Sequence, residues 1–299
     1  YKGLNQAQKK AVDTVEGAVM VVAGPGTGKT TVLTLRIAKI LLETQINPEN
    51  ILALTFTENA AHEMRKRLLS IIGQDAYRVE ITTFHSFCNL IIKKNQEEFS
   101  EMISSENINE LEQLSILEKI MESLPLIKLR PLGDLTYYVK HVLSAINELK
   151  RENISPDIFE EGLKNFEDDL LSRDDLYHQK GPHKGKMKAE HQKSLSGIEK
   201  NKELLLIFAQ YQKELKDKKK YDYNDMLLEV IEKFKLHPYL LQYFQEKFQY
   251  FLIDEHQDTN AAQNKIVELL VGFFENPNLF VVGDEKQANG LDGRNGRAD

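Results

Sequence analysis

The stretch that decides the fold of this 299-residue chain is Ala23-Gly24-Pro25-Gly26-Thr27-Gly28-Lys29-Thr30. It follows an apolar run at 19–22 that is typical of a buried parallel strand, and it precedes apolar residues with helical spacing at 32–38. A glycine-rich turn in this position points backbone N–H groups and the positive end of a helix dipole at an anion. The stretch therefore predicts a phosphate-binding loop, in preference to a glycine-rich turn without a ligand.

Lys29 and Thr30 carry the chemistry expected of this loop. The ammonium group of Lys29 would reach the β- and γ-phosphates of a nucleoside triphosphate, and the Thr30 hydroxyl would ligate Mg²⁺. Alanine in place of glycine at the first position is compatible with the geometry of such a loop. We expect contacts with the nucleotide from the whole loop and from the residue after it: Ala23, Gly24, Pro25, Gly26, Thr27, Gly28, Lys29, Thr30 and Thr31.

Composition limits the other functions that the chain could have. With 41% hydrophobic and 28% charged residues, it is long enough for a full core and two domains. Its apolar runs have the length of strands, which excludes a membrane-spanning segment. The N-terminus has neither a secretion signal nor an initiator Met, so we expect a trimmed chain. The single cysteine, Cys88, indicates a reducing, cytoplasmic location. Because the net charge is −7, any nucleic-acid binding must depend on local sites.

Apolar runs predict five strands of one sheet. Several are nearly continuous, as expected where helices cover both faces of a parallel sheet. The predicted strands are 19–23, 51–56, 79–83, 250–254 and 279–283.

Between the third and fourth predicted strands the pattern becomes helical. Apolar residues recur at helical spacing over 111–124, 135–146 and 204–215, and Ser155-Pro156 is a typical helix start. We therefore predict an α/β domain formed by 1–92 and 221–299, interrupted by an inserted, mainly helical domain at 93–220.

One segment of this helical block, 178–193, is rich in basic residues. It holds five Lys and three His against one Glu, with Gly and Pro and almost no large apolar residue, which predicts a mobile loop. We interpret it as a solvated linker in preference to an arm that contacts the phosphates of a nucleic acid. The spacing of His178, His183 and His191 fits no common metal-ligand pattern.

Polar residues that suit phosphate chemistry follow the last two predicted strands. Asp254, at the end of the predicted strand 250–254, would hold Mg²⁺. Glu255, the next residue, would act as the general base that activates water. Gln287, after the strand 279–283, could hydrogen-bond the γ-phosphate or the attacking water. We therefore expect Lys29, Glu255 and Gln287 to act in catalysis, and Thr30 and Asp254 to bind the metal.

Seven motifs in this order resemble those of the superfamily 1 DNA helicases of the UvrD/Rep/PcrA type. The resemblance implies a RecA-like P-loop NTPase sheet, ATP and Mg²⁺ as cofactors, adenine recognition by Gln8, and 3′→5′ movement on single-stranded DNA or at a junction of single and double strands. The motifs are 4–8, 23–30, 54–64, 82–88, 221–227, 254–260 and 283–287.

Within two of these motifs, side chains suited to DNA lie next to predicted strands. Phe56, Phe84 and His85 offer flat faces for stacking with unpaired bases, and Thr57, Thr83 and Ser86 offer hydroxyls to backbone phosphates. Phe84 and Phe87 could instead be core aromatics; we prefer that interpretation for Phe87 and the DNA contact for Phe84.

Three departures from the family pattern affect the predicted activity. His256 stands where relatives carry an aromatic residue, and 288–296 has no aromatic side chain to stack on a base. The chain stops at Asp299, without the family's second ATPase-like domain and its arginine fingers. We therefore expect this chain to bind nucleotide, to hydrolyse it poorly and not to unwind DNA, as the N-terminal portion of a helicase.

A different class of function would use the same motifs. The chain could be an ATP-dependent switch that binds DNA within a larger assembly without unwinding it. The altered segment 288–296 favours this alternative. A small-molecule kinase is the weaker alternative, because 82–87 and 283–287 would have no role in it.

Overall fold

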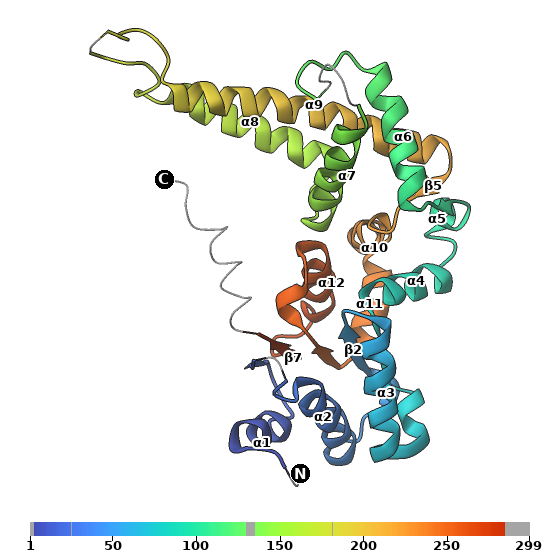
Figure 1. Cartoon of the computed structure of the whole chain (residues 1–299). Coiled ribbons are helices and arrows are strands. Elements are labelled where there is room, and N and C mark those ends of the chain that lie inside the picture. Colours follow the sequence, from blue (N-terminus) through green and yellow to red (C-terminus); the bar gives the residue numbers. More distant parts are fainter. Residues whose placement is uncertain (1–2, 25, 130–134, 181, 285–299) are drawn as a thin grey trace. The chain divides into compact units, whose positions relative to one another are not determined.

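The computed structural model describes residues 3–24, 26–129, 135–180 and 182–284. The chain forms two compact units, which are described separately (Figure 1). The first unit consists of Tyr1–Glu98 with Glu229–Asp299, and the second of Phe99–Leu228.

A single five-stranded sheet organises the first unit. All its neighbouring strands are parallel, and the register places Leu252 between Ala53 and Phe280. The predicted strands and their parallel arrangement are confirmed, each with a shift of one residue at one end. In spatial order the strands are β1 (Val19–Val22), β7 (Asn278–Gly283), β6 (Tyr250–Ile253), β2 (Ile51–Thr55) and β3 (Glu80–Thr83).

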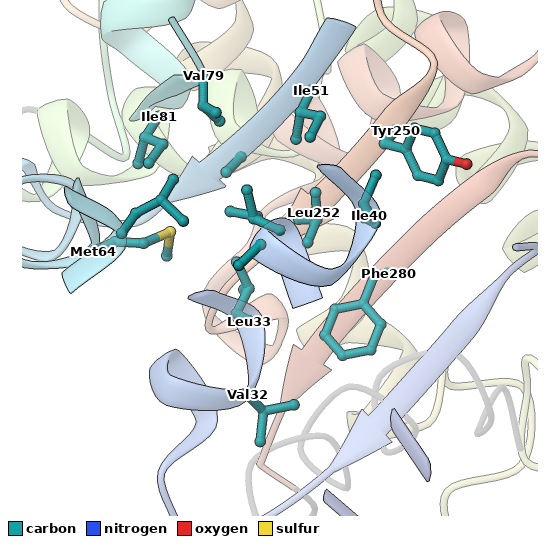
Figure 2. Close-up of a cluster of buried hydrophobic side chains, with 14 of the residues drawn as sticks. Val32, Leu33, Ile40, Ile51, Met64, Val79, Ile81, Tyr250, Leu252 and Phe280 are labelled. Atoms are coloured by element: carbon teal, nitrogen blue, oxygen red, sulfur yellow. The ribbon is translucent and has the colours of Figure 1, made fainter. Parts of the chain in front are cut away.

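Helices cover both faces of this sheet, as the apolar strands require. One face packs against α1 (Gln6–Asp13), α2 (Lys29–Glu43) and α3 (Glu58–Ile72). Figure 2 shows the side chains of this core, to which the helices contribute Leu33 and Met64 and the strands contribute Leu252 and Phe280.

The opposite face of the sheet has an aromatic core. Phe87 on α4 (Phe84–Lys94) makes edge contacts with Phe244 on α11 (Pro238–Lys247) and with Phe248, which in turn contacts Phe251 of β6. Phe87 is completely buried, which confirms its prediction as a core residue. The remaining helices of the C-terminal part are α10 (Asp225–Leu236), whose first residues belong to the second unit, and α12 (Ala261–Val271).

The second unit is mainly helical, as predicted. Its core forms where α6, α7 and α9 pack together, and Ser155 caps α8 as its sequence indicated. Its elements are α5 (Ser100–Ile103), β4 (Glu106–Asn107), α6 (Glu110–Ser123), α7 (Leu135–Arg151), α8 (Pro156–Ser172), α9 (Ala189–Asp217) and β5 (Lys220–Tyr221), with β4 and β5 paired in parallel.

The basic segment 178–193 is only partly a loop. Figure 1 shows α8 and α9 running alongside each other, joined by this connection at one end. Tyr177 and Met187 form an antiparallel bridge, and α9 begins at Ala189. The last five residues of the predicted loop, 189–193, are therefore helical. The predicted mobility stays a prediction.

A buried ion cluster ties α7 to the segment before α10. The fully buried Lys150 ammonium donates to the Asp222 and Asp225 carboxylates, and the Tyr211 hydroxyl donates to Asp222. A buried lysine is tolerated only where countercharges and hydrogen bonds surround it. In the described parts of the chain, no helix combines the length and apolar character needed to cross a bilayer.

Candidate functional site

The carboxyl ends of the five parallel strands meet at one edge of the sheet. Ala23 follows β1, Asp284 follows β7, Asp254 follows β6, Phe56 follows β2 and Phe84 follows β3. In open α/β sheets this is the edge where ligands bind. The topology therefore gathers there the motifs that the sequence singled out.

The phosphate-binding loop has the backbone that its glycines permit. Gly26 and Gly28 have φ angles of +74° and +82°, in the left-handed region that side chains rarely adopt. Gly28 is the N-cap of α2 and has no side chain to cap the helix, so the first N–H groups of α2 are directed at the loop. Thr27 Oγ1 donates to the Gly24 carbonyl at 2.8 Å. Pro25 lies outside the described residues.

Gln8 is joined to this loop across a wide sequence separation. Its Nε2 donates to the Thr27 carbonyl at 2.8 Å, while its own helix is held by an Asn5 capping box. A cavity of about 710 Å³ opens beside the loop, a size that accommodates a nucleoside. Its lining includes Gln8, Lys10, Met20, Val22, Thr27 and Lys29.

The loop lysine and the predicted base lie in direct contact. Lys29 Nζ is 2.8 Å from Glu255 Oε2, and the Lys29 side chain is only 9% exposed. Glu255 is a non-glycine residue with φ +49° and ψ +47°, a strained conformation that is concentrated at functional sites. Although burial opposes it, the hydrogen bonds from Lys29 and Gln257 hold the pKa of Glu255 below its usual range.

The two predicted metal ligands also lie together. Thr30 Oγ1 donates to Asp254 Oδ2 at 3.1 Å, and Asp254 is buried with 2% exposed. Burial and the neighbouring Glu255 carboxylate raise the pKa of Asp254. A cation placed between these oxygens would neutralise the buried carboxylate, and oxygen donors are those that Mg²⁺ prefers. This donor set therefore fits Mg²⁺.

The prediction from sequence missed Gln257. Its Nε2 donates to Glu255 Oε2 at 2.7 Å, and its Oε1 accepts a hydrogen bond from the Asp284 N–H at 3.0 Å. A β-carbon added at Gly283 would lie 3.1 Å from Gln257 Oε1, so the glycine gives this amide room. Gln257 thus links the ends of β6 and β7. Its position in the motif 254–260, beside both acids, was the signal that could have found it.

A second residue missed from the sequence is Arg67. Its Nη1 donates to Thr31 Oγ1 at 3.1 Å, which brings an α3 cation to the start of α2. Nothing in the sequence separates Arg67 from the other charged residues of α3. Gln287 lies outside the described residues, as does the segment 288–296.

The predicted DNA contacts are divided between surface and interior. Phe56 is 53% exposed, and Thr57 caps α3 at the same edge. Thr83 caps α4 and is mostly buried, whereas His85 is half-buried. Phe84 is 1% exposed, so its ring offers no face to a base in this structure. The first residue of α4 packs inward because the helix starts directly at the strand end.

The histidines of the basic segment do not form one cluster. The rings of His178 and His183 lie 5.9 Å apart, whereas His191 lies with Asp175 and Glu190, the one group of metal-ligand spacing in the described ranges. Lys188 Nζ is already 3.1 Å from Asp175 Oδ2. We attribute this cluster to ion pairing.

A parallel sheet with a phosphate-binding loop after one strand and an Asp-Glu pair after another defines a RecA-like P-loop NTPase. The chain belongs to the UvrD/REP helicase N-terminal domain family, whose model matches residues 4–288. The resemblance predicted from the motifs is thereby confirmed.

Three curated relatives are similar to almost the whole of this chain. The ATP-dependent DNA helicase PcrA of Bacillus subtilis strain 168 is 33% identical over 286 residues, which are 96% of this chain and 33% of that protein. PcrA of Staphylococcus epidermidis is 31% identical over 287 residues (96% and 34%). PcrA of Staphylococcus aureus is 30% identical over 285 residues (95% and 33%). The chain thus spans about a third of the length of these relatives.

Proposed function

We propose that this chain is the ATP-binding, DNA-contacting N-terminal portion of an ATP-dependent DNA helicase or translocase. The observation that carries the proposal is the convergence of Lys29 and Thr30 with Asp254 and Glu255, which are distant in sequence, at one sheet edge. The name shared by the relatives, ATP-dependent DNA helicase, supports the same substrates. We assign the first unit to the RecA-like domain and the second to the inserted helical domain.

At the nucleotide, each side chain would have a separate task. Gln8 would bind the adenine, since it borders the cavity and holds the loop. Lys29 would bind the β- and γ-phosphates, and Glu255 Oε2 would accept the proton of the attacking water. Gln287 would respond to the γ-phosphate.

Mg²⁺ would be held by Thr30 and Asp254. When bound, it would neutralise charge on the phosphate oxygens as the terminal phosphoryl group departs. The proposal for this metal is supported by the donor pair of hydroxyl and buried carboxylate at 3.1 Å.

At the same edge, the neighbouring strands would contact DNA. The exposed Phe56 ring and the half-buried His85 ring would stack on unpaired bases. The hydroxyls of Thr57, Thr83 and Ser86 would hydrogen-bond the backbone phosphates. We leave Phe84 out of these contacts because it is buried. The expected ligand is single-stranded DNA or a junction of single and double strands, with 3′→5′ movement in the cytoplasm.

The test is ATP turnover by the full-length protein and nucleotide binding by this chain, each with and without oligo(dT), with duplex DNA as the comparison. Stimulation of turnover by the single strand supports the motor. Nucleotide binding with DNA binding but without stimulation would favour the ATP-dependent switch. A chain that binds neither ligand at low salt would contradict both.

A further inference from the structure

The hydroxyl groups that face the proposed DNA-binding edge already have an acceptor. Ser86 Oγ donates to Glu58 Oε1 at 2.6 Å, and Thr83 Oγ1 donates to the same oxygen at 2.7 Å. Distances this short are typical of hydrogen bonds to an ionised carboxylate. Glu58 is the first residue of α3, three residues after the end of β2, and is exposed.

The number of protons on the two hydroxyls limits what they can bind at one time. A serine or threonine hydroxyl carries a single O–H proton, and a phosphate oxygen can only accept. Thr83 Oγ1 also accepts from the Ser86 N–H at 3.2 Å, so its proton is what it has to offer a ligand. While Glu58 accepts both protons, neither hydroxyl can donate to a DNA phosphate.

We propose that Glu58 competes with the DNA backbone for Thr83 and Ser86, and that it thereby sets the affinity of this edge for single strands. The inference rests on the proposed function, because it presupposes that these hydroxyls meet DNA. The carboxylate takes the place of a phosphate oxygen, with the same sign of charge and the same donors. A strand can use the two hydroxyls only after the Glu58 side chain has turned away.

Two features of Glu58 suit it to this competition. The hydrogen bonds from Ser86 and Thr83 lower its pKa, so the carboxylate is ionised at neutral pH and repels phosphate. Its side chain is exposed and belongs to a helix held by the Thr57 cap, so it can change rotamer without loss of the helix.

The experiment measures the affinity of the 299-residue chain for fluorescently labelled oligo(dT) by anisotropy at low salt. Glu58→Gln removes the charge and keeps the shape, and it should bind the strand about 5- to 30-fold more tightly than the wild type. Glu58→Ala should also bind more tightly, because both hydroxyl protons are released. Glu63→Gln is the matched control: it removes the same charge from an exposed position of α3 and should change affinity less than about twofold.

A double-mutant cycle separates competition from a general effect of charge. Ser86→Ala should weaken binding more in the Glu58→Ala background than in the wild type, because only there has the hydroxyl lost its acceptor and become available to DNA. Equal effects of Ser86→Ala in both backgrounds would contradict the proposal, as would a Glu58→Gln variant that binds no more tightly than the wild type. Failure of every variant, wild type included, to bind oligo(dT) would instead overturn the proposed DNA contact itself. Thermal melting of each variant confirms that it is folded.

Discussion

Lys29 Nζ and Glu255 Oε2 lie 2.8 Å apart, which pairs the loop cation directly with the proposed general base. Gln257 donates to the same Glu255 oxygen at 2.7 Å. A phosphate that reaches Lys29 must therefore share or replace this carboxylate. The contact couples the binding of the triphosphate to the freedom of the base.

Replacement of Glu255 by Gln should lower ATP turnover without weakening nucleotide binding. Loss of a general base lowers turnover by about 10²- to 10⁴-fold. Affinity for a non-hydrolysable ATP analogue should stay the same or increase, because Lys29 loses an anionic competitor. Turnover is measured in the full-length protein with oligo(dT) present and compared with Glu246→Gln, which changes an exposed carboxylate on α11. Normal turnover in Glu255→Gln would remove Glu255 from the role of base.

Gln257 should act as a positioning residue for Glu255. Gln257→Ala removes the hydrogen bonds to Glu255 and to the Asp284 N–H, so we expect turnover to fall about 10-fold with analogue affinity changed less than about threefold. Gln257→Glu should lower turnover more than Gln257→Ala does, because it places a second carboxylate against Glu255. The reverse order of the two variants would show that the amide does not hold the base.

The dependence of nucleotide affinity on Mg²⁺ should require Asp254. In the wild type, chelation of Mg²⁺ with EDTA should weaken binding of the ATP analogue. Asp254→Asn should reduce that difference about 10-fold, because one of the two oxygen ligands loses its charge. Asp75→Asn, an exposed acid of the same unit, should keep the wild-type response. An unchanged Mg²⁺ response in Asp254→Asn would place the metal elsewhere.

The buried ion cluster of the second unit should be decisive for its stability. Lys150→Met leaves the Asp222 carboxylate, which is 1% exposed, without its countercharge. Loss of one partner of a buried pair costs about 3–5 kcal/mol in the free energy of unfolding. Urea denaturation followed by circular dichroism measures this, with the exposed Lys140→Met on the same helix expected within about 0.5 kcal/mol of the wild type. A loss below about 1 kcal/mol for Lys150→Met would show that the carboxylates find other partners.

Local signals in the sequence were enough for most of the fold. The strands at 51–55 and 250–253, which are apolar except for Thr55, are buried at every residue, as expected in a sheet covered on both faces. The order of the strands was not predictable in this way, because it depends on how the chain crosses between them. The same crossing brings Asp254 to Thr30.

The parts of the site that sequence reasoning missed depend on tertiary contacts. Phe56 and Phe84 both follow strand ends, yet one is 53% and the other 1% exposed. Their difference arises from where the next helix begins, at Glu58 after a cap residue in one case and at Phe84 itself in the other. Similarly, Gln257 accepts a hydrogen bond from the Asp284 N–H after β7. No local sequence pattern predicts a contact between residues this far apart in the chain.

The most direct test of the account is calorimetric titration of the wild-type chain and of Lys29→Ala with a non-hydrolysable ATP analogue and Mg²⁺. We expect the wild type to bind and Lys29→Ala to lose at least about 10-fold in affinity, since hydrogen bonds to charged groups contribute about 1.5–3 kcal/mol. Lys265→Ala, a partly exposed lysine on α12, should bind as the wild type does. Equal affinity of Lys29→Ala and the wild type, or no binding by either, would contradict the proposal that this sheet edge holds a nucleoside triphosphate.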